Sequence, residues 1–198
     1  MKIEYFYGLP SPFAYLGSAR LQSIAKKHNV EIIEKPCDLV GGIFTKTGGL
    51  PVPQRSPQRQ KFRLDELSRW SDFLNIKINI KPKFFPPKNP HLPSKYIIAA
   101  NLLGVKIVFG HELLKQAWSE EKDIADEKNI EIASNIFELN FKELSELAKS
   151  DKVAEIYQNN TEEAVAKNVF GSPTYIFNNE LFFGQDRLEF LERALSKS

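Results

Sequence analysis

The chain contains little sulfur and little histidine. Cys37 is its single cysteine, and His28, His91 and His111 are its only histidines. A lone cysteine rules out an intrachain disulfide, a thiol pair for redox cycling and a cysteine-rich metal site, and no two histidines stand at a metal-ligand spacing such as i, i+4. Cys37 ends an apolar stretch, where we expect a buried core residue. The sequence therefore predicts neither disulfide chemistry nor a metal centre.

Long apolar runs and an excess of one charge are also missing. No stretch approaches the roughly 18 uninterrupted apolar residues of a membrane helix. The start of the chain, residues 1–7, has an early acid and lacks the apolar run of an export signal. Because 27 Lys and Arg nearly balance 25 Asp and Glu, no global field favours nucleic acid or a membrane surface. We expect a cytoplasmic protein that binds neither nucleic acid nor membrane.

Core-forming residues, in contrast, are plentiful. The 198 residues are 42% hydrophobic and include 15 Phe, enough for one large globular domain or for one domain with a substantial insertion. One local basic segment, residues 54–69, is mixed with proline and acids, and we interpret most of it as a solvated helix face. Its cations are Arg55, Arg59, Lys61, Arg63 and Arg69.

The first forty residues have the pattern of a β-α-β unit. Residues 2–7 alternate and are rich in Ile, Tyr and Phe, which predicts a strand. Ser11 stands at the N-cap position of a following helix and Pro12 at its first position, where a missing amide donor costs nothing. Residues 30–34 predict a second strand. Strands joined in this way are parallel, so the unit indicates an α/β core.

The middle of the chain changes to helices separated by Pro and Gly. The proline-dense residues 81–93 predict an extended loop, whose Phe84 and Phe85 either line a pocket or pack into the core. Helices are expected over residues 57–74, 94–103, 108–119, 131–138, 141–149 and 151–168.

The end of the chain returns to strands. Residues 174–177 and 181–183 predict a hairpin, with asparagines in its turn that can adopt positive φ. A terminal helix is expected over residues 187–195, with Asp186 as its cap.

Ser11 is the first candidate for chemistry. Unpaired amides and the positive end of the helix dipole favour an anion at a helix start, so a thiolate bound there would be stabilised. A free thiol has an ordinary pKa of about 8.5, which a helix start and a hydroxyl donor could lower. On its own, however, a serine before a proline at a helix start is ordinarily only a cap.

Ser11 also belongs to a pattern that involves both ends of the chain. Residues 11–17 read SPFAYLG, residues 160–174 run from NTEEAVAK to FGSPT, and residues 183–188 read FGQDRL. These segments resemble the 2-hydroxychromene-2-carboxylate isomerases and the similar kappa-class glutathione transferases, in the DsbA branch of the thioredoxin-like superfamily. The family's motif S-P-[FY]-x-[WY]-L-G has a serine in place of the first cysteine of an ancestral C-x-x-C. The resemblance covers essentially the whole chain.

The resemblance implies a fold and a division of the chain. It implies an α/β thioredoxin-like fold with a large all-helical insertion domain. Residues 1–40 and 168–198 would form the thioredoxin-like domain, and residues 41–167 the inserted helical domain. Members of these families are often dimers, which extends the expectation to a homodimer, although no apolar stripe argues for one independently.

The resemblance also assigns glutathione contacts. Ser11 would be the catalytic serine that holds the glutathione thiolate. Pro173 would be the cis-proline of thioredoxin-like folds, and Ser172 would pair its backbone with the cysteinyl part of glutathione. Gln185 and Asp186 would bind the γ-glutamyl end, whose carboxylate suits helix amides and whose ammonium suits a carboxylate.

The residues expected near the glycyl end of glutathione depart more from the family pattern. Arg59 stands where the family has a lysine near the glycyl carboxylate. Leu50 occupies the nearest equivalent of a family asparagine, so one expected glutathione contact is in doubt. Phe183 replaces a tryptophan common in the isomerases and keeps an aromatic wall, while Gln185 is typical of the isomerases.

The activity that the resemblance implies is glutathione-dependent isomerisation of an aromatic carboxylate. Two alternatives stay open at this point. One is a kappa-type transferase that conjugates glutathione to a small electrophile. The other is a thioredoxin-like binding module without catalysis, which the Leu50 departure favours.

Overall fold

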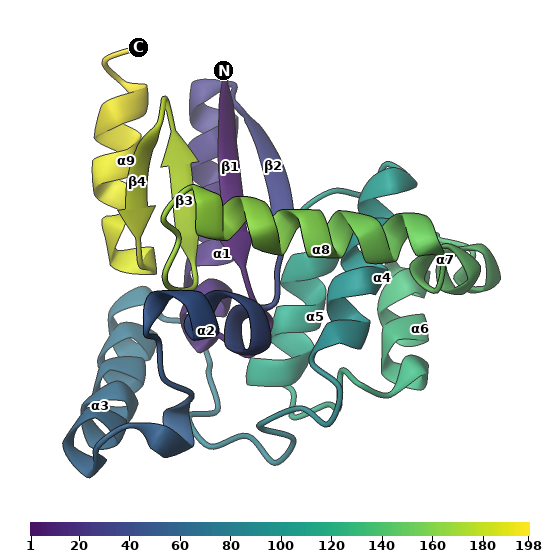
Figure 1. Ribbon diagram of the computed structural model, residues 1–198, viewed down its shortest axis with the longest axis horizontal. Coiled ribbons are helices and arrows are strands. Elements are labelled where there is room, and N and C mark those ends of the chain that lie inside the picture. Colours follow the sequence, from purple (N-terminus) through teal and green to yellow (C-terminus); the bar gives the residue numbers. More distant parts are fainter.

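A four-stranded mixed sheet organises the protein. The computed structural model describes residues 1–198. The strands lie in the order β2-β1-β3-β4; β2 is parallel to β1, whereas β3 runs antiparallel to both β1 and β4. Figure 1 shows the sheet beside a group of helices. The strands are β1 (Lys2–Tyr7), β2 (Glu31–Pro36), β3 (Thr174–Phe177) and β4 (Glu180–Phe183).

Helix α1 (Pro12–His28) connects β1 to β2. It begins as the sequence predicts, since Ser11 is the N-cap and its Oγ accepts a hydrogen bond of 3.3 Å from the amide of Ala14. It ends at Asn29, which takes the left-handed conformation with φ of 51°. The predicted β-α-β unit with parallel strands is confirmed.

The other helices lie between β2 and β3, except for the last. All six helices predicted for the middle of the chain are present. Short helical turns occur at Leu39–Ile43 (η1), Val52–Gln54 (η2) and Gln185–Arg187 (η3). The helices are α2 (Phe44–Thr47), α3 (Pro57–Leu74), α4 (His91–Leu102), α5 (Val108–Trp118), α6 (Glu127–Ile136), α7 (Phe141–Ala148), α8 (Asp151–Ala166) and α9 (Leu188–Leu195).

Three helix starts differ from the prediction. Helix α4 begins three residues earlier than expected, and α6 begins at Glu127 because the Asp126 side chain caps it by accepting from the amide of Lys128. The prediction that Asp186 caps the last helix is wrong. Asp186 lies inside the turn η3, where its carboxylate pairs with Arg187 at 3.0 Å, and α9 has no side-chain cap. Gly184, with φ of 99°, leads the chain into that turn.

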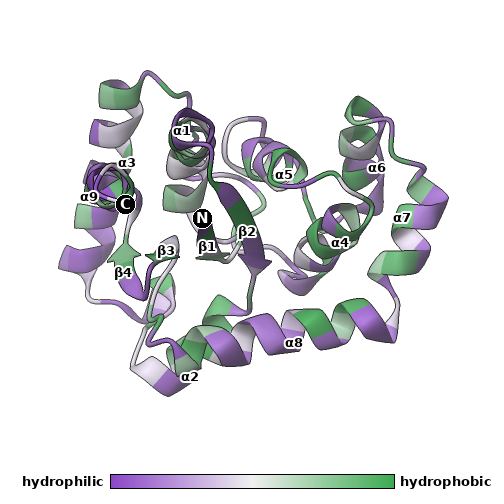
Figure 2. Cartoon of the chain, turned by 90° about the horizontal axis from the view of Figure 1, so that it is seen from above, coloured by the Kyte–Doolittle hydropathy of each residue, from purple (hydrophilic) through white to green (hydrophobic).

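The two faces of the sheet bury different cores. Ile3, Tyr5 and Tyr7 on β1 belong to a large core that includes residues of α1 and α9 and continues into α4 to α7. Phe6 points the other way, into a smaller core with Cys37 and residues of α2 and α8. Figure 2 accordingly shows α1 and α8 on opposite sides of the sheet. Each fully buried aromatic contributes about 1.5–3 kcal/mol, so this alternation fixes the register of β1.

Two connecting segments had specific predictions: the β3–β4 turn and the proline-dense loop, residues 81–93. The β3–β4 turn contains Asn178 and Asn179 with φ of 49° and 64°, which confirms the hairpin prediction. In the proline-dense loop, the half-buried Phe85 packs against Trp118 with ring centroids 5.2 Å apart, while Phe84 is exposed. No helix of the structure has the length and hydropathy needed to cross a membrane.

Candidate active site

Ser11 lies where the chain leaves β1 and enters α1, next to the loop before β3. Its Oγ donates a hydrogen bond of 2.9 Å to the carbonyl of Ser172, and the Ser172 Oγ accepts one of 3.1 Å from the amide of Gly8. The Ser172–Pro173 peptide bond is cis, as the resemblance implied. Two segments 161 residues apart in sequence are therefore held together by the side chains that the motif contains.

The Ser11 hydroxyl can serve as a donor to an anion. A serine hydroxyl has one proton, which here points to a neutral carbonyl, and it can rotate toward a charged acceptor that binds it more strongly. The amide of Phe13, in the first turn of α1, has no intrahelical acceptor, and the helix dipole adds positive potential. The side chain is only 5% exposed, so these interactions act in a partly dehydrated place.

The turn η3 adjoins the same loop. The amide of Gly184 donates a 2.9 Å hydrogen bond to the carbonyl of Pro173. Gln185 is 1% exposed, and its Oε1 accepts from Arg20 of α1 at 2.9 Å, so its side chain is anchored within the protein. Asp186 has a half-exposed carboxylate. Of this pair, only Asp186 presents its side chain to the surface, and Gln185 offers its backbone.

An aromatic wall stands beside Ser172. The ring of Phe183 packs on Phe170 with centroids 4.7 Å apart, and both rings are partly exposed. Gly171 lies directly against the Phe183 ring, where a Cβ atom would collide with it. The predicted aromatic replacement at Phe183 thus forms a surface next to the residue that precedes the cis-proline.

Arg59 lies in a different part of the site. It lines a hollow of about 470 Å³ between α3 and the start of α1, which we call the arginine hollow. Figure 1 shows α3 beyond the end of the sheet at which β1 leads into α1. The hollow is lined by Phe13, Arg55, Gln58, Arg59, Phe62, Arg63 and Glu66.

Arg63 is the residue that the sequence interpretation missed. Most of the basic segment is solvated as predicted, but Arg63 is only 8% exposed, and its guanidinium lies against the rings of Phe85 and Trp118. The available signal was spacing, since Arg59 and Arg63 stand four residues apart and so share one side of α3. Leu50, the departure from the family pattern, is exposed, and its carbonyl accepts from Arg55 Nε at 2.8 Å.

The protein's own thiol is unsuited to chemistry. Cys37 is 2% exposed, which confirms the buried position expected from sequence. Burial, aided by the charge of Asp38, raises the pKa of its thiol to about 12, so the thiol stays protonated at neutral pH. A thiolate at Ser11 would have to come from a bound molecule.

A second serine lies near a histidine but is not an activated nucleophile. Ser18 Oγ and His111 Nδ1 are 2.6 Å apart. Ser18 Oγ also lies 3.0 Å from the carbonyl of Tyr15, an acceptor within its own helix. Burial also lowers the pKa of His111, and Ser18 is 1% exposed. This pair therefore serves packing.

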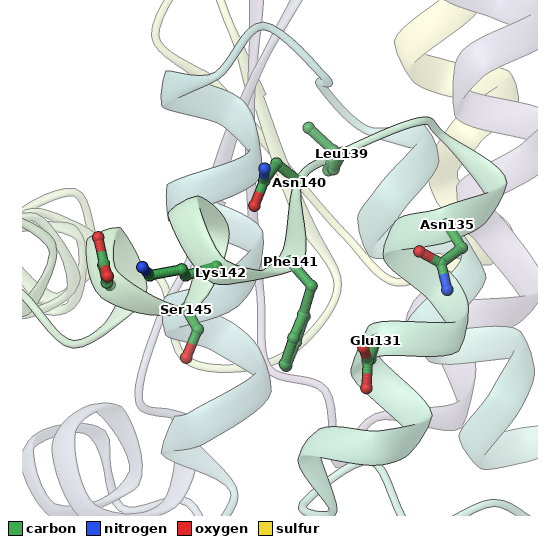
Figure 3. A pocket seen from close by; sticks show the side chains of 8 residues that line it. Glu131, Asn135, Leu139, Asn140, Phe141, Lys142 and Ser145 are labelled. Carbon is green, nitrogen blue, oxygen red and sulfur yellow. The ribbon is translucent and has the colours of Figure 1, made fainter.

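A hollow of about 640 Å³ between α6 and α7 contains none of the predicted site residues. Figure 3 shows Glu131 and Asn135 on one side and Lys142 and Ser145 on the other, with Phe141 between them. The Phe141 ring stacks on Tyr96 with centroids 6.0 Å apart, so its role is packing. The motif residues lie elsewhere, around Ser11.

Known proteins are similar to this chain over almost its whole length. A 2-hydroxychromene-2-carboxylate isomerase from Sphingobium xenophagum is 21% identical over 193 residues, which cover 98% of this chain and 97% of the relative. Glutathione S-transferase kappa 1 from Rattus norvegicus is 23% identical over 207 residues, which cover 98% of this chain and 91% of the relative. A solved structure of a 2-hydroxychromene-2-carboxylate isomerase matches with a TM-score of 0.82 at 22% identity, covering 100% of this chain and 95% of that one.

The predicted resemblance and the thioredoxin-like fold are both confirmed. The family model described as a DSBA-like thioredoxin domain matches residues 2–196, nearly the whole length. The chain belongs to the family of DSBA-like thioredoxin domains.

Proposed function

We propose that the protein is a glutathione-dependent isomerase of 2-hydroxychromene-2-carboxylate or a related aromatic carboxylate. The observation that supports this most directly is the position of the Ser11 hydroxyl, 2.9 Å from the carbonyl that precedes a cis-proline and at the start of α1. The buried Cys37 supports it further, because the only thiolate this site can use is one brought by a ligand. The relatives named as isomerase and as glutathione transferase support the same class of ligand.

The residues around Ser11 fit a tripeptide thiol. The Ser11 hydroxyl donates to the sulfur, and the backbone of Ser172 pairs with the cysteinyl unit. Asp186 attracts the γ-glutamyl ammonium, and Gln185 contributes backbone at the same turn. Arg59, exposed in the arginine hollow, is the cation for the glycyl carboxylate.

The roles in catalysis follow from these positions. Bound glutathione would supply a thiolate that adds to a conjugated carbon of the substrate, permits rotation about the former double bond, and leaves unchanged. Ser11 lowers the free energy of the anionic sulfur both before addition and on departure, because its hydroxyl and the helix start face that point. The aromatic wall of Phe170 and Phe183, next to Ser172, offers apolar surface to the substrate ring.

The direct test is turnover of 2-hydroxychromene-2-carboxylate with glutathione, followed by the absorbance of the isomer. We expect turnover without consumption of glutathione. Since a hydrogen bond to a charged group contributes about 1.5–3 kcal/mol, Ser11→Ala should lose about ten- to a hundredfold in kcat/KM. Ser150→Ala is the matched control, because Ser150 caps α8 in the same way and lies away from the site. Equal activity of Ser11→Ala and wild type would refute the proposal.

The kappa-type transferase is the second candidate, and the similarity to glutathione S-transferase kappa 1 over 98% of this chain favours it. It needs the same activation at Ser11 but leaves the substrate attached to sulfur. Loss of glutathione in step with product would support it over isomerisation. If calorimetry detects no heat with millimolar glutathione, the chain is instead a binding module without this catalysis.

A further inference from the structure

We propose that Arg63 binds the carboxylate of a planar aromatic ligand at the inner end of the arginine hollow. As a substrate site this assignment rests on the proposed function, because it supplies the cation that an aromatic carboxylate substrate needs. The binding itself requires no glutathione and can be measured alone.

Arg63 is buried without a charged partner. Its side chain forms no salt bridge, and its Nη2 atom is shielded from solvent and has no hydrogen-bond acceptor. An unpaired polar or charged group in that position costs stability, and buried guanidinium groups are normally matched by a carboxylate or a carbonyl. The Nε and Nη1 atoms of Arg63 also form no hydrogen bond but are less shielded than Nη2, and Arg63 lines the hollow, so a ligand carboxylate there would supply acceptors to these atoms.

The arginine hollow is positively charged. Arg55 and Arg59 line it together with Arg63, and neither forms a salt bridge. Glu66, the one acid in the lining, is paired with Arg69 outside it. Burial, and then the charge of Arg55, lower the pKa of Arg63 to about 10, so its guanidinium is still protonated at neutral pH. The hollow therefore presents three cations and no free carboxylate to a ligand.

Aromatic side chains lie around the cations of the hollow. The guanidinium carbon of Arg63 lies 5.5 Å from the ring centroid of Phe85 and 5.9 Å from that of Trp118. Phe85 and Trp118 do not line the hollow, whose own aromatic surface comes from Phe13 and Phe62. A volume of about 470 Å³ lies within the range typical of small-molecule sites, roughly 300–1,000 Å³. Aromatic walls with a planar, bidentate donor favour an aromatic carboxylate over inorganic phosphate.

The hollow is connected to the segment around Ser11 through Trp118 and Phe13. Trp118, on which Arg63 packs, donates from Nε1 to the carbonyl of Leu9 at 3.2 Å, two residues before Ser11. Phe13, in the wall of the hollow, lies two residues after Ser11. A carboxylate held at Arg63 would thus keep its aromatic ring on the side of α3, next to the loop that carries the serine.

The test is calorimetric binding of salicylate to the glutathione-free protein, with salicylamide as the uncharged analogue and inorganic phosphate as the simple anion. We expect salicylate to bind and both other probes to bind at least tenfold more weakly. Arg63→Met should weaken salicylate at least tenfold, and Arg63→Lys should retain part of the affinity. Lys61→Met is the matched control, because Lys61 is an exposed cation of α3 outside the hollow, and it should change nothing.

A urea unfolding curve separates binding from packing. If Arg63 is only a clamp between Phe85 and Trp118, then Arg63→Met lowers the urea midpoint and leaves salicylate affinity unchanged, which overturns the inference. We expect Arg63→Met to weaken salicylate binding and to leave the urea midpoint equal to or above that of wild type. Absence of salicylate binding, or phosphate binding as tight as salicylate, would also overturn it. Since no glutathione is present, a failed glutathione assay leaves this result intact, and a failed salicylate assay leaves the proposed function standing.

Discussion

Two clusters of charged side chains differ in composition, because the charges of one are neutralised within the protein and those of the other are not. The ion-pair ring, under α8 on one face of the sheet, closes on itself: Lys35 contacts Glu4 at 2.7 Å and Glu163 at 2.6 Å, and Lys167 contacts the same two acids at 2.6 and 2.8 Å. The arginine hollow, beside the start of α1, has cations without such partners.

The difference indicates which charges stabilise the fold and which are available to bind a ligand. In the ion-pair ring each charge meets two opposite ones, so desolvation is offset inside the protein. In the arginine hollow Arg63 has no carboxylate partner, and its contacts with the Phe85 and Trp118 rings offset its burial only in part, so removing the residue should not harm the fold. Substitutions in the two clusters should therefore have opposite consequences for stability and for binding.

The largest effect is expected for Lys35→Met. This substitution leaves Glu4 and Glu163 with one cation fewer in a place where Lys35 itself is 13% exposed, and we expect the free energy of unfolding to fall by about 3 kcal/mol. Urea denaturation measures it. Lys2→Met is the control, because Lys2 pairs with Glu31 at an exposed edge, 3.7 Å away, and should cost well under about 1 kcal/mol. Equal losses would erase the distinction between the ring and ordinary surface pairs.

A second effect concerns ligand-induced stability. Salicylate at about 100 times its dissociation constant should raise the free energy of unfolding of wild type by about 2.7 kcal/mol. Arg63→Met should show little of this increase, whereas Lys35→Met, although less stable, should show all of it. Loss of the increase in both variants would mean that the two clusters are not independent.

A smaller effect is the acid dependence of stability. Burial tends to raise the pKa of Glu163, but hydrogen bonds from Lys167 and Lys35 outweigh it and hold the pKa below the ordinary value of 4.5. A lowered folded-state pKa contributes stability that is present above 4.5 and is lost as the pH falls through the folded-state value. Unfolding curves below pH 4.5 should therefore show a decline that is shallower in Glu163→Gln. Parallel declines in the two proteins would contradict this.

The smallest effect is expected on the exposed side of α3. Lys61 pairs with Asp65 one turn away, and Lys61→Ala should lower the free energy of unfolding by only about 0.3–0.5 kcal/mol. Thermal unfolding at low and high salt would measure it, with the difference disappearing at high salt. A loss as large as that of Lys35→Met would show that solvent exposure does not separate the two kinds of pair.

Local patterns were sufficient to predict the frame of the site. The Ser11 cap, the parallel strands and the hairpin asparagines follow from chain-local rules, and the position of Pro173 follows from the family motif. The burial of Arg63 could not be predicted in this way, because it depends on Phe85 from the proline-dense loop and Trp118 from α5 meeting around one side chain. The same is true of Gln185, whose side chain turns toward Arg20 of a distant helix.

The misplaced cap has a cause nearer in the chain. Asp186 comes two residues after Gly184 and shortly before an amphipathic helix, which is an ordinary cap pattern. The amide of Gly184 donates to the carbonyl of Pro173, however, which extends the β3–β4 pairing by one position, and the chain then enters η3 before α9 begins. The end of the hairpin, rather than the cap pattern of Asp186, decides where that helix starts.

The most direct measurement is the ultraviolet absorbance of the thiolate when glutathione is added to the protein at neutral pH. Wild type and Ser150→Ala should show the absorbance of an ionised sulfur, with an apparent thiol pKa below that of free glutathione, and Ser11→Ala should show much less at saturating ligand. Saturable glutathione binding with no thiolate signal, or with the same signal in Ser11→Ala, would contradict the assignment of Ser11.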